Sequence, residues 1–154
     1  LNLQQIKEIE LHYSESPDNM IRVIKGTNFN YFSKKAQKNF FNQEFSVTKL
    51  ADRMGIRLSG YKLENIVSTN IKSEGLIRGV IQVPTDGDPI IMLSDHGTIG
   101  GYPKIGVVIS ADLDRVGQLT PGSTVKFKEV SLEEAQNIFK AYTDDTNKYL
   151  NENN

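Results

Sequence analysis

The segment from Leu93 to Pro103 holds the densest group of residues that could do chemistry, in the order Leu-Ser-Asp-His-Gly-Thr-Ile-Gly-Gly-Tyr-Pro. Glycines let a backbone approach a ligand closely and turn its amide groups toward an anion. Asp95 could act as a base or pair with a cation, and Thr98 and Tyr102 could donate hydrogen bonds. The pattern indicates a binding loop, and an ordinary long Gly-rich surface loop remains the alternative.

Polar residues in two other segments could contribute to the same site. Arg53 and Arg57 stand in an alternating run, Arg-Met-Gly-Ile-Arg-Leu, whose period of two predicts both guanidinium groups on one strand face. Such a pair could hold a carboxylate or phosphate, or it could line a solvated face with surface ion pairs. Gln82 is a lone amide in an apolar run, so it either meets a buried partner such as a substrate amide or faces outward.

Several kinds of site are disfavoured by the residue types. His96 lies beside Asp95, but no Ser or Cys nucleophile pattern accompanies it, which argues against a general-base role. The chain has no cysteine and no metal-ligand spacing, so we expect no metal. Because neither a Walker-type loop nor a G-x-G-x-x-G motif is present, a nucleotide would need another arrangement or a partner chain.

The composition fits one domain with neither nucleic acid nor membrane as a partner. The chain has 154 residues and a formal net charge of -1, and its interspersed charges leave no basic face. No apolar run reaches the length of a membrane span, and no secretory signal is visible. We therefore expect a cytoplasmic location.

The elements that must position these residues are short strands joined by Gly and Pro turns. Ser33 is a plausible helix N-cap, and Ser131 with Glu134 forms a capping box that begins the surest helix. Its apolar stripe is predicted to be core. With few helices between strands, we predict a mostly β fold, an antiparallel or mixed barrel with a few short helices and a C-terminal helix. The expected strands are 20–24, 45–49, 53–58, 77–83, 90–93, 105–109 and 124–130. The expected helices are 33–41, 112–119 and one that begins at 131. The apolar stripe of this last helix consists of Leu132, Ala135, Ile138, Phe139 and Tyr142.

Several motifs in fixed order resemble the allophanate hydrolase subunit 2 family. They are 53–58 (Arg-Met-Gly-Ile-Arg-Leu), 79–90, 100–103 (Gly-Gly-Tyr-Pro), 111–113, 118–122 and 125–127, and the likeness runs from about residue 21 to 135. Each motif alone is weak, but their order is specific. The relatives include the C subunit of 5-oxoprolinase, the second half of the carboxyltransferase domain of urea carboxylase, and KipA.

The resemblance implies a cyclophilin-like β-barrel and a division of the chain. Members are longer, so this chain is expected to match their C-terminal half, with residues 1–20 as a connector from a missing N-terminal half. Residues 21–150 would form the carboxyltransferase-type domain and 151–154 a frayed tail. A sister subunit of related fold is the expected partner.

The resemblance also implies roles for site residues. Arg53 would stabilise negative charge on an acyl or phosphoryl oxygen, Asp95 would orient a substrate N–H or activate water, and Tyr102 would complete the catalytic set. Substrate-binding roles fall to Gln82, Thr98, Gly100, Gly101 and Arg57. At 96–99 this chain has His-Gly-Thr-Ile where the family usually carries Arg-Gln-Thr-Thr.

The function implied is that of a subunit of an ATP-dependent amidohydrolase of the 5-oxoprolinase or allophanate hydrolase-related type, acting on a small amide or lactam. ATP would act in the full complex, and the isolated chain is expected to be inactive. One alternative is a KipA-like regulator that binds a protein and antagonises a kinase inhibitor. The other is a carboxyltransferase half-domain, for which carboxybiotin would arrive on another chain because no Met-Lys biotin-attachment motif is present.

Overall fold

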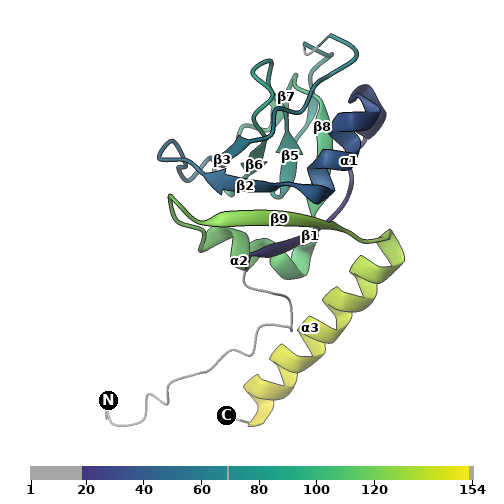
Figure 1. Cartoon of the computed structure of the whole chain (residues 1–154). Helices are drawn as coiled ribbons and strands as arrows, with labels where there is room; N and C mark the ends of the chain where they lie inside the picture. The colour runs from purple at the N-terminus through teal and green to yellow at the C-terminus, as the bar shows by residue number, and fades with distance from the viewer. Residues whose placement is uncertain (1–18, 69, 153–154) are drawn as a thin grey trace.

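The computed structural model describes residues 19–68 and 70–152 and shows a closed barrel (Figure 1). Its strand order is β1-β8-β5-β6-β3-β2-β9, and it closes where β1 pairs with β9 in parallel, whereas its other pairings are antiparallel. The predicted mostly β barrel is therefore confirmed, and of the two predicted alternatives, antiparallel or mixed, it is the mixed one. The barrel strands are β1 (Met20–Lys25), β2 (Glu44–Val47), β3 (Gly55–Gly60), β5 (Val80–Gln82), β6 (Ile90–Met92), β8 (Lys104–Val108) and β9 (Thr124–Glu129).

Helices and a small second sheet surround this barrel. β4 (Glu74–Gly75) and β7 (Ile99–Gly100) pair with each other alone and are called the β4–β7 ribbon below. α1 (Lys34–Asn42) begins as predicted, because Ser33 Oγ accepts a hydrogen bond from the amide of Ala36 at 3.2 Å. The remaining helices are η2 (Phe29–Tyr31), η3 (Ser110–Asp112), α2 (Leu113–Gly117) and α3 (Leu132–Glu152).

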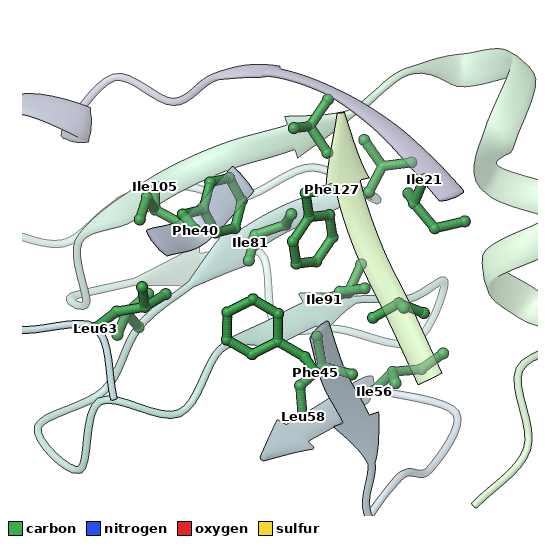
Figure 2. Close-up of a cluster of buried hydrophobic side chains, with 14 of the residues drawn as sticks. Ile21, Phe40, Phe45, Ile56, Leu58, Leu63, Ile81, Ile91, Ile105 and Phe127 are labelled. Carbon is green, nitrogen blue, oxygen red and sulfur yellow. The ribbon is translucent and has the colours of Figure 1, made fainter. Parts of the chain in front are cut away.

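The core fills the barrel with aliphatic and aromatic side chains (Figure 2). Phe40 reaches in from α1 and stacks on Phe127 of β9, with ring centroids 4.6 Å apart. Phe45 of β2 packs against Phe127 at 5.7 Å. Inward positions alternate along β2 and β9, as a period of two requires. This packing fixes the strands whose outer faces carry the candidate site.

A buried ion pair joins β1 to the segment before α2. Asp112 is fully buried, accepts from the backbone amide of Arg22 at 2.7 Å, and accepts from Arg22 Nε at 3.0 Å. Arg115 Nη1 lies 3.8 Å from the same carboxylate and donates to the carbonyl of Met20 at 2.9 Å. Asp112 precedes α2 as predicted, but its carboxylate holds the barrel seam and makes no helix cap.

β5 begins later than its sequence pattern predicts. The apolar run suggests a strand from Ile77, yet Ile77 is 62% exposed and β5 starts at Val80. Gly79 has φ +88°, a left-handed conformation that interrupts an extended strand. The strands predicted at 77–83 and 90–93 form a hairpin, because β5 and β6 pair antiparallel with Ile81 opposite Ile91.

α3 begins at the predicted capping box and lies outside the barrel (Figure 1). The amide of Ser131 donates to the Glu134 carboxylate at 2.6 Å, a bond that lowers the pKa of Glu134. The prediction that the apolar stripe is core is wrong in part, because the helix extends past the barrel edge. Leu132 and Phe139 stay exposed. The half-buried members of the stripe, Ala135, Ile138 and Tyr142, pack against a small buried cluster of Ile109, Ala111 and Val130.

Two of the sequence predictions fall largely outside the described residues. The expected connector, 1–20, is described only from residue 19, and of the expected tail, 151–154, the last two positions are not described. Among the helices that the structure describes, none combines the length and apolar character needed to cross a membrane.

Candidate functional site

The loop that follows β6 brings Arg53 and Asp95 together. Arg53 Nε lies 3.1 Å from Asp95 Oδ2, and the amide of Asp95 donates to the carbonyl of Arg53 at 3.3 Å. Both side chains are open to solvent, with 86% of Arg53 and 52% of Asp95 exposed. Exposed ion pairs contribute little to stability, so this guanidinium is available to a ligand or to a partner surface.

The predicted strand face with two arginines is wrong. Asp52 Oδ1 accepts hydrogen bonds from the amides of Met54 and Gly55, and this Asx-type turn keeps residues 52–54 out of the strand. Arg53 therefore sits in a turn before β3, whereas Arg57 is exposed within β3, opposite Ile90. No hydrogen bond or ion pair in the described part of the chain joins the two arginines.

Gln82 is buried on the outer side of the barrel wall. It is only 3% exposed, while its neighbours Ile81 and Val83 belong to the core inside the barrel. Its Nε2 donates to the carbonyl of Tyr102 at 3.2 Å. The two alternatives predicted for Gln82 were a buried partner and an outward-facing side chain, and each is right in one respect. The side chain faces away from the barrel interior, and it is nevertheless buried with a partner.

The ribbon can lie on Gln82 because Gly100 has no side chain. A Cβ at Gly100 would come within 2.6 Å of Gln82 Nε2 and 2.9 Å of Leu76 Cδ1. Gly75, the other glycine of the ribbon, has open space where its Cβ would be. The glycines of 93–103 are predicted to let the backbone approach a ligand closely; at Gly100 the neighbour observed is the side-chain amide of Gln82.

Gly100→Ala is expected to lower the free energy of unfolding by about 1–2 kcal/mol, because the added methyl group overpacks the contact with Gln82. Gly75→Ala is the matched control and should stay within about 0.5 kcal/mol of the wild type. Urea denaturation of both variants measures the difference. Equal stability of the two variants would show that the ribbon does not rest on Gln82.

The other loop residues hold the ribbon through their backbones. The Thr98 carbonyl accepts from the amide of Leu76 and the Gly101 carbonyl accepts from the amide of Ile71, each at 2.9 Å. The Thr98 side chain is exposed and Tyr102 is 39% exposed. The structure thus forms two contact groups, Arg53 with Asp95 and Gln82 with Gly100 and Tyr102, linked by the single segment 93–103.

Lys104 is a candidate that the sequence reasoning missed. It directly follows Gly-Gly-Tyr-Pro, is 5% exposed, and pairs across the strands with Gln82. Its Nζ lies 2.8 Å from Glu74 Oε2 in the ribbon. The sequence signal for Lys104 was a lone charged residue at the start of an apolar strand. The structure pairs it with Gln82, the other lone polar residue.

The described residues offer no metal centre. Within 19–68 and 70–152, no three His, Cys, Asp or Glu side chains come close enough together to hold a metal ion. The polar groups lie in two places: a guanidinium with the carboxylate of Asp95, and an ammonium and a carboxamide against the ribbon that carries Glu74. These groups bind and polarise amide, carboxylate or phosphate groups by hydrogen bonds and charge.

Residues 3–129 match the family described as carboxyltransferase domain, subdomain A and B. This chain belongs to that family. The match confirms the predicted resemblance, and it takes in every residue of the two contact groups. α3 lies beyond the matched part of the carboxyltransferase domain.

Curated relatives of this carboxyltransferase domain are named as the C subunit of 5-oxoprolinase. The protein from Haemophilus influenzae is 37% identical over 138 residues, which cover 88% of this chain and 45% of that protein. The protein from Escherichia coli is 37% identical over 117 residues, which cover 76% of this chain and 38% of that protein. The chain therefore spans less than half the length of these relatives.

A solved relative has the same barrel. The crystal structure of the Kluyveromyces lactis urea carboxylase matches with a TM-score of 0.77 at 29% identity, covering 81% of this chain and 12% of that one. The relatives are thus subunits or domains of larger proteins.

Proposed function

We propose that this carboxyltransferase domain works within a subunit of an ATP-dependent amidohydrolase of the 5-oxoprolinase type, acting on a small amide or lactam with a sister subunit. The observation that carries the proposal is the 37% identity over 138 residues to the C subunit of a 5-oxoprolinase. In such a reaction ATP would supply the phosphoryl group that turns the amide oxygen into a leaving group. The protein must then hold an amide and stabilise negative charge.

The polar groups of the site suit those tasks. Arg53 is exposed and held by a single ion pair with Asp95, so its guanidinium can turn toward developing negative charge on an acyl or phosphoryl oxygen. Asp95 is then released to accept an amide N–H or to activate water. Gln82 is buried and donates to the Tyr102 carbonyl, so the group that it would offer to a substrate amide N–H is its carboxamide oxygen.

Carboxyl transfer is the second candidate, and the likeness to the Kluyveromyces lactis urea carboxylase favours it. The same site would then receive a carboxylated cofactor carried on another chain, with a small amide as acceptor. Gln82 and Arg53 would keep their roles, because the acceptor is again an amide and the transferred group is again an anion.

Turnover by the complete assembly tests the proposal. The full-length protein is co-purified with its partners from its host and assayed for ATP-dependent glutamate release from 5-oxoproline, with urea and bicarbonate as the alternative substrates. We expect glutamate release by the assembly and none by residues 1–154 alone. Urea-dependent turnover alone would favour carboxyl transfer, and no turnover with any of these substrates would contradict both candidates.

A further inference from the structure

Lys104 is a buried cation that the proposed mechanism has not yet used. It starts β8 and pairs with Gln82 of β5 next to a shift in the strand register, and both side chains meet the β4–β7 ribbon, Lys104 at Glu74 and Gln82 at Gly100. Lys104 is 5% exposed and Gln82 is 3% exposed. An ammonium and a carboxamide therefore both lie buried against a ribbon of two short strands.

The ion pair of Lys104 with Glu74 does not explain this burial as a stabilising device. Removing an ammonium from water is costly, and a well-packed apolar pair is often at least as stable as a buried ion pair. The partner carboxylate is 46% exposed and belongs to a strand of only two residues. The cation is thus buried while its counter-ion remains in contact with solvent.

The hydrogen-bonding capacity around Lys104 is only partly used. A lysine ammonium has three donors, and Glu74 is the one described residue that accepts from Nζ. Gln82 donates through Nε2 to Tyr102, while Oε1 accepts no hydrogen bond within the described ranges. Two ammonium donors and one carboxamide acceptor remain, a set complementary to an anionic oxygen beside an amide N–H.

We propose that Lys104 binds the anionic oxygen of the substrate and that Glu74 is its resting partner, displaced when the ligand arrives. This inference rests on the proposed function, which supplies the small amide as ligand. Because the Glu74 side chain is 46% exposed, it can rotate into solvent and give up its place on Nζ to the ligand. The anionic oxygen belongs either to a carboxylate of the substrate or to a phosphoryl group placed on it.

Kinetics of the full assembly with 5-oxoproline give the first test. Lys104→Met is expected to raise KM about 10-fold or more, because a charge-assisted hydrogen bond to the ligand is lost. Glu74→Gln is expected to lower KM about 3-fold, because the competing carboxylate is gone. Lys25 and Glu129 form a control pair of similar geometry on the surface, with Nζ and Oε1 2.7 Å apart and the two side chains 48% and 47% exposed. Lys25→Met and Glu129→Gln should leave KM unchanged.

A purely structural pair gives a different pattern. Lys104→Met and Glu74→Gln would then both lower the melting temperature and leave KM at the wild-type value, and this result would overturn the inference. Where Lys104→Met fails to fold, Glu74→Gln decides alone, since an unchanged or raised KM contradicts a displaced resting partner.

A second readout separates this inference from the proposed function. Lysines of the Glu74→Gln assembly are acetylated with acetic anhydride and quantified by mass spectrometry, with 5-oxoproline, inorganic phosphate or uncharged 2-pyrrolidone present. Protection of Lys104 by 5-oxoproline identifies a carboxylate as the anion, and protection by phosphate alone identifies a phosphoryl group. Protection without turnover would sink the proposed function and keep the inference. Protection by neither anion, or equally by 2-pyrrolidone, would overturn the inference.

Discussion

Asp112→Ala is expected to lower the free energy of unfolding by about 3–5 kcal/mol, because it removes a fully buried carboxylate that pairs with the Arg22 guanidinium. Asp112 is fully buried, and the Arg22 side chain is 12% exposed. The carboxylate also accepts from the backbone amide of Arg22 at 2.7 Å, so the variant loses a partner of β1 itself. Urea denaturation followed by circular dichroism measures the loss.

Asp114→Ala is the control for this experiment. Asp114 lies two residues away and is 53% exposed, with Arg78 Nη2 3.7 Å from its carboxylate and the Tyr142 hydroxyl donating to it at 3.0 Å. Surface pairs of this kind contribute about 0–1 kcal/mol. If Asp112→Ala and Asp114→Ala unfold at the same urea concentration, the buried pair is not what holds β1 to the α2 segment.

Arg53→Gln is expected to reduce kcat of the full assembly about 100-fold, with the fold unchanged, because one preorganised cation is lost where negative charge develops. At 86% exposure, this side chain adds little to stability, so its free energy of unfolding should change by less than about 0.5 kcal/mol. The expected effect is the reverse of that at Asp112: activity falls and stability does not. ATP-dependent glutamate release and urea denaturation, run on the same preparation, measure the two quantities.

Arg78→Gln is the matched control, because Arg78 is also partly exposed and also faces a half-exposed aspartate. We expect kcat within about 2-fold of the wild type, since Arg78 lies outside both contact groups. If Arg53→Gln and Arg78→Gln retain equal activity, Arg53 is a surface arginine and the charge must be stabilised by other groups or by the partner subunit.

Local signals in the sequence predicted the elements well. The capping residues Ser33 and Ser131 mark the starts of α1 and α3, because a cap depends only on residues within one helical turn. The hairpin of β5 and β6 follows from the Pro and Gly turn between two β-branched runs. The mixed barrel followed from the short spacing of the strands, and the order of the motifs gave the family.

The parts that sequence reasoning missed have one local cause, at Asp52, and otherwise depend on contacts between distant segments. Arg53 lies outside the predicted strand because the side chain of Asp52 accepts hydrogen bonds from the backbone amides of the next residues. The burial of Gln82 and Lys104 comes from a ribbon of two-residue strands, too short to show any periodicity. The stripe on α3 has helical spacing, but spacing alone cannot show how far a helix extends beyond the surface it packs on.

The parallel pairing of β1 with β9, which closes the barrel, affects how the barrel folds during synthesis. β1 has two neighbours, β8 and β9, and Met20 lies opposite Lys126 near the far end of the domain. A nascent chain emerging from the ribosome therefore displays the first strand of the barrel, with apolar Ile21 and Val23, long before either neighbour exists. Such distant pairings fold slowly and leave strand edges open to aggregation. Yield in the cell should accordingly depend on chaperones that cover β1 until synthesis has passed β9.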